Sequence, residues 1–380
     1  MTRVVTLACR VRAAGMGAGR GARRWAGRVA PLLALALLLA ASCGTAPTAP
    51  TSGGAAPAAP AAPAGGGAAG AAASAAPTAV APASFSIGHL PGAAFQWGSY
   101  AALEKGFYTA QGLDLEVVTI ATPNDAARAV VSNSVAVAHF SADAAVRAIE
   151  GGGDLVVVGS EIANPAFSLI VQPEIRDYAD LRGKAIAVST PKDGAAVVLR
   201  LMLRARGLGD DDYDFASVGT TPNRYAALKS KVADGAIMTQ PVDFVALDEG
   251  FKLLGRSTDV LQHFMFMSVS VNRSWAQAQR PALVRYLRGL GQGIDWLYDP
   301  ANKEEAIRIL MERTNTDYSA VSRTYNVYIE EGKVLPRHAE IPVQGLEAYV
   351  QAMIELGDLP GPTAEISRYY DPSYVQAAKQ

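Results

Sequence analysis

The feature that most constrains the fold is an alternation of short β-branched runs with helical segments between residues 84 and 271. Strands are expected at 84–89, 113–119, 135–139, 155–159, 167–171, 183–188, 215–218, 235–238, 251–254 and 264–271. Helices are expected between them at 95–105, 125–132, 142–150, 195–206 and 224–232, and from residue 272 to the end. Such alternation indicates an α/β protein with mainly parallel sheets.

The spacing of the strands predicts two sheets rather than one. A folded part of about 300 residues is large enough to divide into two lobes, each with its own core. We expect the chain to cross between the lobes near residues 169–173 and again near 263–269. Lobe I is then predicted to comprise residues 84–171 and 268–380, and lobe II residues 172–267.

The N-terminal segment has the composition of an export signal. Residues 1–42 contain seven Arg and no Asp or Glu, and the arginines precede the apolar run Pro31–Ala41. A basic region followed by a short apolar run is typical of a secretory signal peptide. The run is too short for a bilayer-spanning helix, which needs roughly 20 residues. We therefore expect residues 1–42 to be a signal peptide that is removed.

Cys43 follows small residues at the end of the apolar run, as in the bacterial lipobox, whose Cys is lipidated after cleavage. The alternative is an ordinary signal that is cleaved nearby, with Cys43 incidental. Residues 43–83 consist almost entirely of Ala, Pro, Gly, Thr and Ser, so they predict a disordered tether. Together these features predict attachment to the outer face of the cytoplasmic membrane through a lipid anchor.

Loss of residues 1–42 would leave 27 Lys and Arg against 35 Asp and Glu, and this acidic balance argues against nucleic acid as a partner. The only other cysteine, Cys9, would be lost with the signal, so neither an intrachain disulfide nor a cysteine-based metal site is expected. The four histidines form no His-Glu-x-x-His motif, and no Gly-x-Ser-x-Gly motif is present. We therefore expect no catalytic residues, no metal and no cofactor.

Three segments resemble one family in their order and spacing: 102–116 (ALEKGFYTAQGLDLE), 181–189 (LRGKAIAVS) and 278–306. They are similar to the NMT1/THI5-like (SsuA-type) periplasmic binding proteins of ABC importers. The resemblance implies a type II periplasmic binding protein fold, with a cleft between two lobes. It also implies a small solute, such as a sulfonate, nitrate, a pyrimidine or thiamine precursor or an aromatic acid. An ABC permease and its ATPase would be the partners, and we expect a monomer.

The ligand is expected beyond the carboxyl ends of the strands, where helix N-termini favour anions. The loops there contain the following candidate ligand-binding residues: Phe95, Gln96, Trp97, Asn124, His139, Ser141, Asn164, Ser189, Thr190, Gly194, Thr221, Arg224 and Gln240. Phe95 and Trp97 are predicted to line an apolar wall, with core packing as the alternative, and a structural role is equally open for His139. Arg224 is predicted to pair with an anion, with a solvated position as the alternative.

The resemblance also bears on the kind of solute. The loop 189–195 has Ala195 where the family often has Ser or Thr, and Gln240 stands where the family often has an acid. These two departures favour an aromatic or heterocyclic solute as a competitor of a sulfonate. The alternative function is a sensor or an enzyme on the same fold, because the family includes a pyrimidine synthase; that enzyme uses a Cys-rich motif, which this chain lacks.

Overall fold

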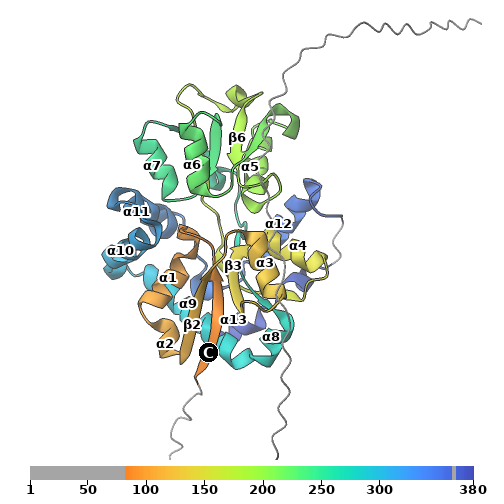
Figure 1. Cartoon of the computed structure of the whole chain (residues 1–380), viewed down its shortest axis with the longest axis vertical. Helices are drawn as coiled ribbons and strands as arrows, with labels where there is room; N and C mark the ends of the chain where they lie inside the picture. Colours follow the sequence, from red (N-terminus) through yellow and green to blue (C-terminus); the bar gives the residue numbers. More distant parts are fainter. Residues whose placement is uncertain (1–81, 362–364) are drawn as a thin grey trace, which may run out of the picture. The chain divides into compact units, whose positions relative to one another are not determined.

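The computed structural model describes residues 82–361 and 365–380, and these residues contain two five-stranded sheets (Figure 1). The first sheet has the order β2-β1-β3-β10-β4, from β1 (Ala83–His89), β2 (Leu113–Thr119), β3 (Val137–Ser141), β4 (Leu155–Ile162) and β10 (Met267–Asn272). The second has the order β7-β6-β8-β5-β9, from β5 (Ser168–Val171), β6 (Ala185–Val188), β7 (Asp214–Ser217), β8 (Gly235–Met238) and β9 (Lys252–Arg256).

Each sheet has one strand that runs against the rest. In the first sheet β10 is antiparallel to both of its neighbours, and in the second sheet β5 is antiparallel to both of its neighbours. The remaining pairs are parallel. The prediction of an α/β fold with mainly parallel sheets is therefore confirmed, and all ten expected strands overlap strands of the described part of the chain.

Helices surround the two sheets, and their bounds follow the sequence pattern. They are α1 (Trp97–Glu104), α2 (Phe107–Ala110), α3 (Pro123–Val131), α4 (Ala142–Glu150), α5 (Gly194–Arg204), α6 (Thr221–Lys229), α7 (Val242–Asp248), α8 (Arg273–Ala278), α9 (Arg280–Leu297), α10 (Lys303–Thr314), α11 (Tyr318–Tyr325), α12 (Val343–Glu355) and α13 (Ser373–Ala378). Several begin at a side-chain cap: Thr122 accepts from the Asp125 N–H at α3, and Asp193 from the Ala196 N–H at α5.

The long helix α9 packs closely on α1 in the core of the first lobe. Its apolar stripe, which includes Leu283, Leu287 and Leu290, is fully buried. The two helices approach at small residues, because a Cβ atom on Gly293 would collide with the Gly98 carbonyl oxygen and one on Gly98 with Ile294. The glycines therefore let the two helix backbones come together.

One predicted lobe boundary is wrong. Residues 168–171 were expected in lobe I, but β5 pairs with β8 and β9 of the second sheet, so the first crossing is the segment 163–167. The apolar run of β5 is buried, and a buried run does not tell which sheet it joins. The second crossing is the segment 257–266, and β10 begins at Met267, one residue before the predicted boundary.

The C-terminal helices contact both lobes rather than lobe I alone. Helix α12 packs against α4 of lobe I and α5 of lobe II, and α11 packs against α7 of lobe II. In the described residues no helix is long and apolar enough to cross a membrane. The predicted signal peptide, Cys43 and nearly all of the predicted tether lie outside the described residues.

Candidate ligand-binding site

A cavity of about 250 Å³ lies between the two lobes, at the carboxyl ends of several strands. Lobe I contributes residues that follow β1, β2 and β3, lobe II contributes residues that follow β6, β7 and β8, and both crossings contribute an aromatic ring. The lining residues are Leu90, Pro91, Ala93, Phe95, Ala121, Thr122, Pro123, Asn124, Ser141, Asp143, Phe167, Ser189, Thr190, Asp193, Gly194, Ala195, Gly219, Thr220, Thr221, Arg224, Thr239, Phe266 and Met267. This is the position at which open α/β sheets bind their ligands.

The structure brings eight of the predicted site residues together in the wall of this cavity. They are Phe95, Asn124, Ser141, Ser189, Thr190, Gly194, Thr221 and Arg224. The other five described candidates do not line it: Gln96, Trp97, His139, Asn164 and Gln240.

Gln96, Trp97 and His139 are fully buried in lobe I, behind the wall of the cavity. The Trp97 indole N–H donates to the Ala306 carbonyl over 3.1 Å, which fixes the ring in the core. His139 Nδ1 lies 2.5 Å from a Glu161 carboxylate oxygen, and its Nε2 lies 2.5 Å from the Tyr286 hydroxyl. The alternative interpretations, core packing for Trp97 and a structural role for His139, agree with these contacts.

Gln240 and Asn164 bond to the protein near the crossings. The Gln240 amide donates to Asp243 over 2.8 Å and to the Ser168 hydroxyl over 3.3 Å, which turns it away from the cavity wall. The Asn164 side chain accepts from the Phe264 N–H over 3.3 Å and so joins one crossing segment to the other. A sequence pattern places a residue on a loop, but it does not fix the direction of its side chain.

Three phenylalanines form the apolar wall. Phe95 lies 5.3 Å from Phe167 and 5.1 Å from Phe266, and the rings of Phe167 and Phe266 are 4.9 Å apart, measured between centroids. Edge-to-face and tilted packing of this kind is favourable. Phe167 and Phe266 are absent from the predicted site. They could have been found only by placing the two crossings correctly, because each ring lies on a crossing segment.

Arg224 forms the polar end of the cavity. Its side chain is buried, and the guanidinium donates to the Ser189 hydroxyl, to the Gly219 carbonyl over 3.1 Å and to the Thr221 hydroxyl over 2.6 Å. Burial lowers the pKa of Arg224 to about 10, with the nearby Asp193 acting in the opposite direction. No carboxylate of the described residues forms an ion pair with Arg224, and its Nε has no hydrogen-bond partner there. The site therefore holds a buried positive charge whose counter-ion is not supplied by the described protein.

Two acidic side chains and one serine complete the wall, and the two acids are also absent from the predicted site. Asp143 of lobe I is bound by Arg147 at 2.5 Å and by the Tyr349 hydroxyl at 3.0 Å. Asp193 of lobe II caps α5. The Ser141 hydroxyl is buried in the wall without a hydrogen-bond partner in the described residues, so it can bond to a polar group of a ligand.

The Asp193 carboxyl gives a prediction for the pH dependence of stability. Burial raises its pKa, although the Ala196 N–H, the Ser189 hydroxyl and Arg224 act to lower it. A raised folded-state pKa gives a contribution to stability that is full below the ordinary pKa and is lost as the pH rises through the folded-state value. Asp193→Asn keeps the helix cap, because Asn is also a good N-cap, and removes this titration.

We therefore expect urea unfolding to show a smaller loss of stability for Asp193→Asn than for the unchanged protein as the pH rises from about 4 to 7. The pKa of Asp243 is also raised by burial, but this group is present in both proteins and cancels in the comparison. A difference in unfolding free energy that stays constant with pH would contradict the prediction.

The fold and the cleft define a two-lobed protein of the periplasmic binding protein class. The chain belongs to the NMT1/THI5-like family, whose model matches residues 96–303, more than half of the 380-residue chain. The family predicted from the sequence is thus confirmed. Within the described residues, no cluster of three or more His, Cys, Asp and Glu side chains could hold a metal ion.

Two solved structures illustrate the likeness of the fold. The nitrate-binding protein NrtA from Synechocystis PCC 6803 is 14% identical with a TM-score of 0.69, and the match covers 78% of this chain and 88% of that protein. The alkanesulfonate-binding protein SsuA from Xanthomonas axonopodis pv. citri, bound to MOPS, is 19% identical with a TM-score of 0.62, over 74% of this chain and 96% of that protein. At these identities the likeness shows the fold alone.

One curated relative shares more sequence over a shorter stretch. It is a Haemophilus influenzae protein named for thiamine biosynthesis, and it is 31% identical over 121 residues. The match covers 31% of this chain and 38% of that relative, so the chain spans less than half of the relative's length.

Proposed function

We propose that the chain is the extracytoplasmic solute-binding protein of an ABC importer, and that it captures a small organic anion with an aromatic body. The observation that carries this proposal is Arg224, a buried cation at one end of the cavity with no ion-pair partner among the described carboxylates. A buried charge is costly until it is paired, so an anionic group of the solute would supply the missing partner. The opposite end is formed by the rings of Phe95, Phe167 and Phe266, which suit an apolar body.

The two-lobed arrangement supports a function in capture and delivery. A solute that touches both walls of the cleft binds the closed form better than the open form, so it shifts the population toward closure. The permease then recognises the closed form. The sulfonate and nitrate named for the two similar structures are both anions, in keeping with the charge of Arg224.

Export and membrane attachment are part of the same proposal. The basic and apolar residues before Cys43 and the Ala/Pro-rich stretch after it support a signal peptide, a lipidated N-terminus and a tether, and we propose a monomer. We infer that the protein stands at the outer face of the cytoplasmic membrane, where a permease and its ATPase can accept the solute.

A second candidate is a neutral aminopyrimidine of thiamine metabolism. The relative named for thiamine biosynthesis favours it, and so do the carboxylates of Asp143 and Asp193 in the wall, which can accept hydrogen bonds from an amino group. Turnover of such a compound would indicate the enzyme alternative, whereas simple binding would indicate transport or sensing.

Isothermal titration calorimetry tests the proposal with four probes: benzenesulfonate, benzoate, benzyl alcohol and 4-amino-5-hydroxymethyl-2-methylpyrimidine. We expect one of the two anions to bind at a single site, and benzyl alcohol, which has the ring without the charge, to bind at least 30-fold more weakly, since a charge-assisted contact contributes about 2 kcal/mol or more. Tight binding of the pyrimidine with no binding of either anion would contradict the anion proposal.

A further inference from the structure

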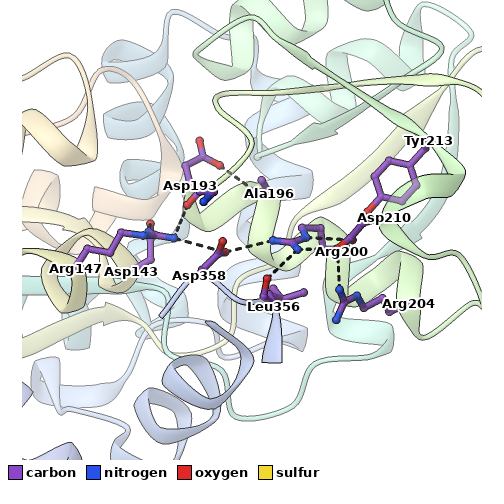
Figure 2. A network of polar contacts seen from close by, with 11 residues as sticks. Asp143, Arg147, Asp193, Ala196, Arg200, Arg204, Asp210, Tyr213, Leu356 and Asp358 are labelled. Atoms are coloured by element: carbon purple, nitrogen blue, oxygen red, sulfur yellow. Dashed lines mark hydrogen bonds and ion pairs between the residues drawn. The ribbon is translucent and has the colours of Figure 1, made fainter. Parts of the chain in front are cut away.

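The C-terminal segment contains a carboxylate that lies between arginines of the two lobes. Asp358 follows α12, and its side chain is only 3% exposed. It lies 3.7 Å from the Arg147 guanidinium of α4 in lobe I and 3.3 Å from the Arg200 guanidinium of α5 in lobe II (Figure 2). One buried carboxylate therefore neutralises two cations that belong to different sheets.

The lobe I arginine connects this contact to the solute cavity. Arg147 also binds Asp143, whose carboxylate lines the cavity, and donates to the Lys192 carbonyl in the loop before α5 over 2.5 Å. A single side chain thus touches the cavity wall of lobe I, a loop of lobe II and the C-terminal segment. Its position depends on all three being close together.

The lobe II arginine is held in a similar way. Arg200 is 12% exposed, and it donates to the Leu356 carbonyl over 3.2 Å in addition to its pair with Asp358. It also pairs with Asp210 of its own lobe at 2.7 Å. Arg200 thus has two contacts to the C-terminal segment and one within lobe II, and these can be removed separately.

Helix α12 adds a further contact to the cavity wall. Its Tyr349 hydroxyl donates to Asp143 over 3.0 Å, and the Gly194 Cα at the start of α5 lies so close that a Cβ atom there would be 2.5 Å from the same hydroxyl oxygen. The C-terminal segment consequently reaches both lobes at two levels, near the cavity through Tyr349 and farther out through Asp358.

We propose that Asp358 latches the two lobes in the closed arrangement by pairing with Arg147 of lobe I and Arg200 of lobe II. The cavity residues do not include Asp358, so it acts through closure and is a positioning residue for the solute site. Opening the cleft separates the two arginines and leaves a poorly hydrated charge on at least one side. Such a buried charge is costly without its partner, and this cost favours the closed form.

The inference predicts opposite results for two carboxylate substitutions on Arg200. Asp358→Asn removes the contact between the lobes, whereas Asp210→Asn removes the contact within lobe II and serves as the matched control. We expect small-angle X-ray scattering of the solute-free full chain to give a larger radius of gyration for Asp358→Asn than for the unchanged protein and Asp210→Asn. Asp358→Glu, which retains the charge, is expected to restore much of the compaction.

The latch rests on the proposed function only for its second readout, the affinity for benzenesulfonate. Because the variant must close without the latch, we expect its dissociation constant to rise about 5- to 150-fold, the usual range for coupling between a site and a conformational change. Arg200→Gln is expected to behave like Asp358→Asn, and the double variant is expected to be no weaker than either single variant, since both remove the same contact.

The two failures can be told apart. If benzenesulfonate does not bind the unchanged protein, the anion proposal fails, while the scattering comparison still tests the latch. Circular dichroism and the melting temperature establish that each variant is folded. A folded Asp358→Asn and a folded Arg200→Gln with the radius of gyration of the unchanged protein would overturn the latch, as would a dissociation constant within twofold of it.

Discussion

Replacing Arg224 by Gln is expected to abolish most of the binding of an organic anion while leaving the protein folded. The guanidinium is the cation of the cavity wall, and burial already lowers its pKa to about 10. Removing one member of a buried charge pair typically costs 2–5 kcal/mol, which corresponds to a dissociation constant that rises on the order of 30- to 1,000-fold. Calorimetric titration with benzenesulfonate and benzoate measures this change.

The same substitution has a different expected effect on stability. Without a solute, Arg224 keeps its charge buried without an ion-pair partner among the described residues, so its loss removes a desolvation cost together with its hydrogen bonds. We expect the unfolding free energy of Arg224→Gln to fall by no more than about 1 kcal/mol.

Arg204→Gln provides the control for this prediction, because Arg204 is 40% exposed and pairs with Asp210 at 2.8 Å, away from the cavity. It is expected to bind the anions as the unchanged protein does. Retention of anion binding by a folded Arg224→Gln protein would show that the cavity cation is not the recognition group.

Replacing Gly194 by Ala is expected to weaken solute binding by forcing the lobes apart. A Cβ atom at this position would lie 2.5 Å from the Tyr349 hydroxyl oxygen, 2.6 Å from an Asp143 carboxylate oxygen and 2.9 Å from a carbon of the Phe266 ring. All three neighbours lie outside lobe II, whereas Gly194 begins helix α5 of lobe II. Overpacking of this kind costs typically 1–3 kcal/mol, so the dissociation constant is expected to rise about 5- to 150-fold.

Gly209→Ala is the matched control for this substitution. It makes the same chemical change in lobe II, but its nearest neighbour would be the Asp212 carboxylate at 3.8 Å, which is an ordinary contact. Helix propensity alone would make Gly194→Ala stabilising, since Ala is the better helix former. Unchanged affinity together with a higher melting temperature for Gly194→Ala would therefore contradict the close approach of the lobes at this glycine.

The strands and the family were predictable because both depend on local signals. Runs such as 155–159 and 235–238 are β-branched and apolar, and they became strands irrespective of their neighbours. Strand β5 shows where this reasoning ends. Its residues are as buried as those of β4, and only the pairing with β8 and β9 decides that it belongs to the second sheet.

The candidate site was predictable to the level of loops, but not of side chains. Arg224 and Ser189 were placed correctly in the cavity wall, because a strand end and a helix start come together there. His139 lies on an equally suitable strand end, yet its ring bonds to Glu161 and Tyr286 inside the core. Phe266 escaped prediction because its exposure to the cavity depends on where the second crossing passes between the lobes.

The central claim is that the cleft holds one organic anion through Arg224, and native mass spectrometry of the purified full chain tests it most directly. The unchanged protein and Arg224→Gln would each be incubated with equal amounts of benzenesulfonate, benzoate, benzyl alcohol and the aminopyrimidine. We predict one anion per chain in the unchanged protein and a much lower occupancy in the variant. A neutral compound bound in place of the anions, or equal anion occupancy in the two proteins, would contradict the account.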